Sequence, residues 1–214
     1  MIEIIPAINV DTFDEVMERI KIAEPYVQTI HIDVSDGSFT SHAVWHDASA
    51  VSRLVTRAAI EIHYMVDRPE NSIEPWLSAP TVKRVIVHEE STRRVGDLIH
   101  HAHALGKELG VAIKPQTPWE RLEPFLIMAD MVQTLAVTPG PSGQQFDERV
   151  LEKILKLRQQ APGIPIEVDG GIHSGIAHQC IEAGATRLVV GSSLFTPDMP
   201  FEQALEILKR DVGI

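Results

Sequence analysis

Two histidines and two aspartates stand at the ends of short apolar segments, and these residue types bind metal ions and transfer protons. His31 and Asp33 lie in THIDVSDG, His63 lies in EIHYMV and Asp169 lies in EVDGGI. Residues two apart in a strand point to the same face, so His31 and Asp33 can act together. In one parallel sheet, all four side chains would meet at its C-terminal edge. Two imidazoles and two carboxylates suit a divalent metal, and the carboxylates also suit acid–base catalysis.

A simpler interpretation is that His31 and His63 are hydrogen-bonded histidines of the core. The set of four favours a metal site, because buried carboxylates without a cation are costly.

The segments that must position these residues alternate between strand and helix patterns along the whole chain. Eight apolar runs rich in Ile and Val are typical of parallel strands covered on both faces. They are residues 2–7, 27–33, 59–65, 83–88, 109–114, 131–137, 164–168 and 187–191. Capping residues and helical periodicity predict helices over 13–23, 47–57, 70–78, 92–105, 147–160, 175–183 and 200–210, and another that begins at Pro118.

Eight such units without a linker or a break in composition predict a single (β/α)8 barrel domain over residues 1–214. An open doubly wound sheet is the alternative, but PAINVD follows the first strand where a G-x-G-x-x-G motif would be expected. Active sites of barrels lie at the C-terminal ends of the strands, and all four residues fall there.

The composition excludes several classes of partner. The net charge of −11 argues against nucleic acid and against an anionic membrane surface. No apolar run is long enough to predict a transmembrane helix. The one cysteine, Cys180, excludes an intrachain disulfide, fits a cytoplasmic location and is expected to be a buried structural thiol.

Glycine-rich segments follow the last three predicted strands. They are VTPGPSGQQF (137–146), Asp169-Gly170-Gly171-Ile172 and Gly191-Ser192-Ser193. Glycine lets the backbone approach an anion closely, and barrel enzymes commonly bind phosphate after their late strands. The sequence therefore predicts a site for a small phosphorylated molecule.

Other polar residues are weaker candidates for chemistry. His88-Glu89-Glu90 ends the fourth strand and could line the mouth of the barrel. Lys114 ends the fifth strand and could form a Schiff base, although a structural role is favoured. The histidines within 100–103 are expected on a solvated helix face, and residues 41–47 are expected to form a lid over substrate.

The motifs resemble those of the ribulose-phosphate 3-epimerases over nearly the whole chain. HIDVSDGSF is similar to the family's HIDVMDGHF, EIHYMV to D-x-H-L-M-V and VTPGPSGQQF to N-P-G-F-G-G-Q-x-F. IEVDGGI and VVGSSLF match the family almost letter for letter. Five motifs in the right order make the resemblance specific.

The resemblance implies a role for each matching residue. His31, Asp33, His63 and Asp169 would ligate one divalent metal ion, which could be zinc, iron(II), manganese or cobalt. Asp33 and Asp169 would also be the acid–base carboxylates, and Met65 would lie beside the reacting centre. The implied substrate and phosphate contacts are Gly140, Pro141, Ser142, Gly143, Gly170, Gly171, Gly191 and Ser192. A homo-oligomer is also implied.

The implied reaction inverts C3 of a ketose phosphate and converts D-ribulose 5-phosphate to D-xylulose 5-phosphate. A proton beside the ketone leaves from one face and another returns to the opposite face, so two carboxylates alternate as base and acid. The divalent ion would act as a Lewis acid that stabilises the enediolate.

Several positions depart from the family pattern and keep alternatives open. Val10 replaces a serine that contacts substrate in the family, and Ser35 and Leu135 replace methionines. Pro141-Ser142 replaces Phe-Gly, and His42 replaces an asparagine. These changes motivate an epimerase of a hexulose 6-phosphate (allulose 6-phosphate type), or a non-catalytic sugar-phosphate binder. A barrel lyase or decarboxylase is disfavoured, because those siblings carry D-x-K-x-x-D where this chain has EIHYMVD.

Overall fold

Eight parallel strands close into a barrel, in a computed structural model that describes residues 2–214. Each strand pairs with the next in the chain, and β1 pairs with β8. The strands are β1 (Glu3–Ile8), β2 (Thr29–Val34), β3 (Ala59–Tyr64), β4 (Val82–His88), β5 (Glu108–Ile113), β6 (Met131–Leu135), β7 (Ile166–Asp169) and β8 (Arg187–Val190). Every predicted strand overlaps one of these, and the predicted (β/α)8 fold is confirmed.

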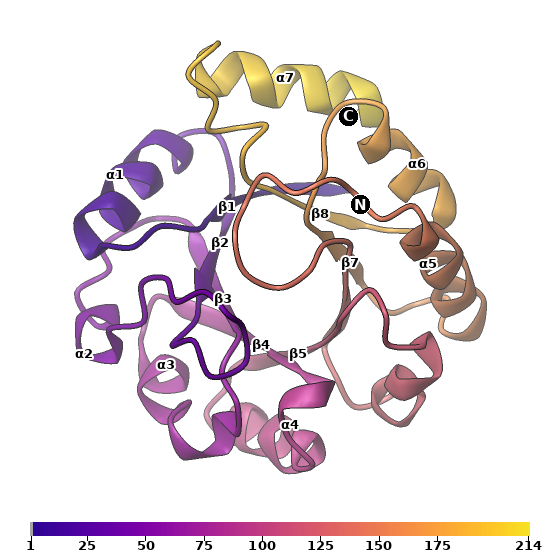
Figure 1. Cartoon of the computed structure of the whole chain (residues 1–214). Helices are drawn as coiled ribbons and strands as arrows, with labels where there is room; N and C mark the ends of the chain where they lie inside the picture. The colour runs from indigo at the N-terminus through magenta and orange to yellow at the C-terminus, as the bar shows by residue number, and fades with distance from the viewer. Residues whose placement is uncertain (1) are drawn as a thin grey trace.

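The helices form an outer ring around the strands (Figure 1). They are α1 (Phe13–Ala23), α2 (Ala48–Val51), α3 (Glu74–Ser78), α4 (Val95–Ala104), α5 (Arg149–Gln160), α6 (Ile176–Ala183) and α7 (Phe201–Val212). Short 3-10 segments cover Pro69–Asn71, Glu89–Ser91 and Trp119–Phe125. No helix within residues 2–214 has the length and apolar character needed to cross a membrane.

The start of α1 follows its sequence signal closely. Thr12 Oγ1 accepts a hydrogen bond from the backbone N–H of Glu15 at 3.3 Å. Glu15 Oε2 in turn accepts one from the N–H of Thr12 at 3.1 Å. This reciprocal capping satisfies two donors that the helix itself cannot pair.

Three predicted helices are shorter or tighter than expected. The helix expected over 70–78 is the 3-10 segment Pro69–Asn71 followed by the five-residue α3. The helix expected over 47–57 ends at Val51, and Thr56 Oγ1 donates to Glu24 Oε2 at 2.8 Å as the chain turns toward β3. The helix expected from Pro118 is the 3-10 segment Trp119–Phe125, which contains Pro124. Proline has no N–H to donate and its ring clashes with the preceding turn, so it kinks or breaks an α-helix.

Alternation along the strands divides the barrel interior from the outer core. On β1, Ile5 and Ala7 face the interior together with Val189 of β8, whereas Ile4 and Ile8 pack in the large cluster shared with the helices. Cys180 of α6 also belongs to that cluster, and burial raises the pKa of its thiol to about 12. Cys180 is therefore a buried thiol, as the sequence predicts.

Candidate active site at the mouth of the barrel

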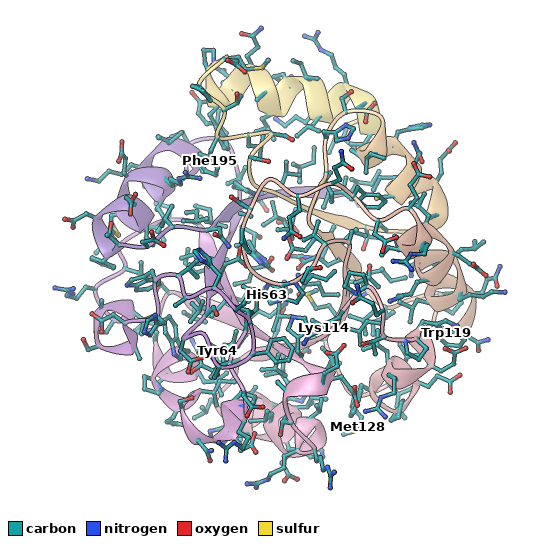
Figure 2. All side chains as sticks on the ribbon, viewed as in Figure 1. His63, Tyr64, Lys114, Trp119, Met128 and Phe195 are labelled. Atoms are coloured by element: carbon teal, nitrogen blue, oxygen red, sulfur yellow. The ribbon has the colours of Figure 1, made fainter. Side chains whose placement is uncertain are left out.

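The four predicted residues meet at the C-terminal end of the barrel, which we call the mouth. His31, Asp33, His63 and Asp169 each offer one ligand atom, and these atoms lie within 4.8 Å of one another. His63 Nδ1 lies 3.0 Å from Asp33 Oδ1 and 3.2 Å from Asp169 Oδ2. His31 Nε2 lies 3.4 Å and 3.9 Å from the same two oxygens. Figure 2 shows His63 near the centre of the ring, whereas Trp119 and Phe195 lie toward its periphery.

The chemistry of this cluster fits a divalent metal ion. His31 Nε2 is buried and makes no hydrogen bond with any of residues 2–214. A buried polar atom without a partner costs about 1–3 kcal/mol, so a ligand for it is expected. Two imidazole nitrogens and two carboxylate oxygens aimed at one place are a donor set that zinc and other divalent ions accept. The cluster could therefore bind a metal ion.

His31 is oriented by a carboxylate on its other side. Its Nδ1 lies 2.9 Å from Glu61 Oε1, and Glu61 Oε2 accepts hydrogen bonds from Arg84 and Arg187 at 2.6 Å and 2.9 Å. Burial opposes ionisation of Glu61, but the hydrogen bond to His31 and the two arginines lower its pKa to about 2. An ionised Glu61 accepts the Nδ1–H of His31 and leaves the lone pair of Nε2 facing the cluster.

His63 is held by a second chain of polar groups. Its Nε2 lies 2.9 Å from His88 Nε2, and His88 Nδ1 lies 3.2 Å from Glu90 Oε2. Burial lowers the pKa of His88 to about 4, despite the nearby Glu90, so its ring is neutral at neutral pH. A neutral His88 can donate to Glu90 and accept from His63, which directs the Nδ1 of His63 toward the two aspartates. His88 and Glu90 thus lie behind His63, whereas Glu89 pairs with Arg121 outside the mouth.

The two aspartates each accept a hydrogen bond from a carboxamide. Asn9 Nδ2 donates to Asp33 Oδ2 at 2.8 Å, and Gln133 Nε2 donates to Asp169 Oδ2 at 3.0 Å. The sequence prediction missed both amides. The alternation of inward residues was the available signal, because Asn9 is two residues beyond inward-facing Ala7 and Gln133 is two beyond inward-facing Met131.

The predicted substrate contacts all line one pocket above the cluster. Its walls include Asp33, His63 and Asp169 together with the expected Met65, Gly140, Pro141, Ser142, Gly143, Gly170, Gly171, Gly191 and Ser192. The connection between β6 and α5, which contains the first of these glycines, crosses the opening of the barrel (Figure 1).

Gly171 can be no other residue in this backbone arrangement. Its φ is +69°, and a Cβ there would lie 2.6 Å from the backbone nitrogen of Phe146. The space and the backbone conformation therefore both require glycine. The absence of side chains at Gly170 and Gly171 leaves backbone groups accessible at the pocket wall.

The structure corrects the expected rim of the site. Val10 was expected at a substrate-facing position, and this is wrong, because Val10 packs in the outer core while Ala7 and Asn9 line the pocket. The parity of side chains along an extended segment explains the difference. Ser35 is buried in the following loop, where it donates to the His42 carbonyl at 2.9 Å, and it is not part of the pocket wall.

Lys114 and the helix histidines lie away from the proposed chemistry. Lys114 Nζ lies 3.7 Å above the ring of Phe39, outside the set of residues that line the pocket. On the outer surface, His101 pairs with Glu74 and His103 pairs with Asp130. This placement fits the structural role expected for Lys114. It also fits the solvated helix face expected for the histidines of 100–103.

Comparison with known proteins identifies the family. The family model described as "Ribulose-phosphate 3 epimerase family" matches residues 3–195. The chain is 33% identical over 197 residues to the chloroplastic ribulose-5-phosphate-3-epimerase of Arabidopsis thaliana, covering 89% of this chain and 70% of the relative. It is also 33% identical over 185 residues to the ribulose-phosphate 3-epimerase of Chlamydia muridarum, covering 83% and 80%.

A solved structure of 3-hexulose-6-phosphate synthase from Salmonella typhimurium has a TM-score of 0.75 at 17% identity, covering 99% of this chain and 98% of that one. That likeness shows the shared fold alone. The family expected from the motifs is confirmed by the match across the barrel. This chain belongs to the ribulose-phosphate 3-epimerase family.

Proposed function

We propose that this protein is a metal-dependent epimerase that interconverts D-ribulose 5-phosphate and D-xylulose 5-phosphate. The observation that carries the proposal is the convergence of two aspartates and two histidines within 4.8 Å, beside a pocket whose wall includes glycine segments. Membership of the family supports the same chemistry.

Asp33 and Asp169 are the two groups that would exchange protons with C3. They enter the mouth from β2 and β7, which are separated in the ring by β1 and β8. Carboxylates that approach from different sides can address the two faces of one carbon. One removes the C3 proton and the other donates a proton to the opposite face, which inverts the configuration.

His31, Asp33, His63 and Asp169 would hold the metal, which we expect to be zinc, iron(II), manganese or cobalt. When bound, the ion would supply Lewis acidity toward the ketone oxygen. Glu61 and His88 fix the ring orientations of the two histidines through the contacts described above. These fixed orientations reduce the reorganisation needed to bind the ion.

Backbone groups rather than cationic side chains would bind the phosphate. Within residues 2–214, the lining of the pocket contains no lysine or arginine. The N–H groups of Gly170, Gly171, Gly191 and Ser192 are the proposed donors, since accessible backbone N–H groups bind anions well. We further infer a cytoplasmic homo-oligomer, from the lone cysteine and the family.

A hexulose 6-phosphate of the allulose type is the second candidate substrate. Ala7, Asn9 and Leu135 line the pocket and give its wall a different chemistry from the expected serine and methionine. A sugar-phosphate binder without efficient catalysis is the third candidate.

One set of assays separates these candidates. The protein is stripped with a chelator, reloaded with each of the four metals and assayed with both ketose phosphates. We expect turnover of D-ribulose 5-phosphate that is lost on chelation and restored by metal. Turnover of the hexulose phosphate alone would replace the proposed substrate. Bound metal without turnover or C3 proton–deuterium exchange would identify a binder.

A further inference from the structure

The two proposed acid–base carboxylates are held in different ways. Asp33 presents Oδ1 to the histidines, and its other oxygen, Oδ2, accepts the hydrogen bond from Asn9. Asp169 presents Oδ2 to His63, and the same oxygen accepts the hydrogen bond from Gln133. Among the described residues, no hydrogen bond reaches Asp169 Oδ1. Each aspartate thus has one oxygen that does not face the histidines. In Asp33 this oxygen, Oδ2, is hydrogen-bonded to Asn9, whereas in Asp169 this oxygen, Oδ1, has no hydrogen bond from the described residues.

Asn9 also connects Asp33 to the glycine-rich segment that follows β6. Its Nδ2 donates to the carbonyl oxygen of Gly140 at 3.3 Å, in addition to Asp33 Oδ2 at 2.8 Å. Gly140 lines the pocket and has a φ of +137°, a conformation that favours glycine. One amide thus ties a carboxylate of the mouth to a backbone segment of the pocket wall.

We propose that Asn9 is a positioning residue that serves the Asp33 half of the epimerisation, and that Gln133 is its counterpart for Asp169. The inference rests on the proposed function. Without the amide, Oδ1 of Asp33 stays beside the histidines, but Oδ2 loses its hydrogen bond and its fixed relation to the Gly140 segment. Misplacement of a reacting group by about 1 Å can lower a rate about 100-fold. Asp169, still held by Gln133, keeps its place.

The test compares Asn9→Leu with Gln133→Met in the full-length, metal-saturated protein. Both substitutions replace the amide by an apolar side chain of similar length, which removes the N–H donor, and Asn9→Ala is a second, smaller variant for the same position. Each protein converts each epimer in D₂O to low extent, and deuterium at C3 is measured in recovered substrate and in product. Affinity for Mn²⁺ alone is measured by titration, and thermal unfolding verifies the fold.

We expect Asn9→Leu to lower kcat about 10- to 100-fold, with a smaller change in KM. When the substrate is the epimer that Asp169 deprotonates, Asp33 must donate the second proton, and this step is slow in Asn9→Leu. The first step then reverses more often, so the ratio of deuterium in recovered substrate to deuterium in product is higher than in the parent. When the substrate is the epimer that Asp33 deprotonates, the slow step comes first, so this ratio is lower than in the parent. Gln133→Met gives the opposite pattern for the two epimers. Mn²⁺ affinity of Asn9→Leu falls about tenfold, as for other residues that orient metal ligands.

An equal change for both epimers, or a labelling pattern identical to that of the parent, would overturn the inference. If the unaltered protein exchanges no proton at C3, the proposed function fails instead. The Mn²⁺ titration then decides the role of Asn9 separately, since unchanged affinity in both Asn9 variants would mean that Asn9 does not hold Asp33.

Discussion

Carboxylates lie at both ends of the barrel interior, but the groups that face them differ between the two ends. At the N-terminal end, which we call the floor, Arg187 reaches Glu61 and Glu167, each at 2.9 Å, and Arg84 reaches Glu61 at 2.6 Å. At the mouth, the partners of Asp33 and Asp169 among residues 2–214 are imidazoles and the neutral amides of Asn9 and Gln133. Residues 2–214 thus supply guanidinium groups to the floor and no lysine or arginine to the mouth.

The difference suits the floor to a stabilising role and the mouth to the proposed chemistry. Guanidinium groups stay protonated at any pH that the protein meets, so the floor is closed. Burial and the neighbouring Glu61 raise the pKa of Glu167 to about 8, which further limits negative charge there. In the part of the chain that the structure describes, no guanidinium group faces the aspartates of the mouth, which therefore suits a divalent ion. His31 joins the two regions, with Nδ1 toward Glu61 and Nε2 toward Asp33.

The largest expected effect comes from removing one charge at the mouth. Asp169→Asn should lower epimerisation at least about 1,000-fold, since it removes both a proton-transfer group and a proposed ligand. The fold should persist, because asparagine keeps the volume and Asp169 lies at the end of β7. Steady-state kinetics and thermal unfolding measure the two effects, with exposed Asp14→Asn as the control. Near-normal turnover of Asp169→Asn would remove the assignment of this carboxylate.

The matching change at the floor should act on stability. Arg187→Met leaves Glu61 and Glu167 with less compensation, and we expect the free energy of unfolding to fall by about 3–4 kcal/mol. Denaturant titration measures the change. Arg94→Met is the control, because Arg94 forms an exposed ion pair with Asp97 and its loss should change stability by about 0–1 kcal/mol. Equal losses in the two variants would contradict the contrast between floor and surface.

The smallest effect concerns Glu90, the carboxylate behind the mouth. Burial opposes its ionisation, but the hydrogen bonds from His88, Thr117 and the backbone N–H of Lys114 lower its pKa from 4.5 to about 2. A lowered pKa stabilises the fold above pH 4.5, and this contribution is lost as the pH falls from 4.5 toward 2.

Between pH 6 and pH 3, the parent should therefore lose about 2 kcal/mol more unfolding free energy than Glu90→Gln. Urea titrations at both pH values measure this, with exposed Glu18→Gln as the control. The same acid dependence in the parent and in Glu90→Gln would show that Glu90 does not contribute.

Local patterns in the chain were enough to predict the architecture and the four residues that meet at the mouth. Eight apolar runs predicted the eight strands, because a parallel strand that is buried on both faces consists of nearly continuous apolar residues. His31, Asp33, His63 and Asp169 could be grouped because each ends a predicted strand, and the ends of parallel strands meet in a closed barrel. The glycines of the pocket were found for the same reason.

The groups that surround these four residues depend on how the barrel closes, and local patterns did not predict them. The contacts of Asn9 with Asp33 and of Gln133 with Asp169 join different strands or their ends, and the pairing of Arg187 with Glu61 spans most of the chain. Such contacts depend on the register and curvature of the closed sheet, which local periodicity does not encode. The outward direction of Val10 likewise follows from where the chain leaves β1. Motif spacing predicted which residues meet at the mouth, and barrel closure determined their neighbours.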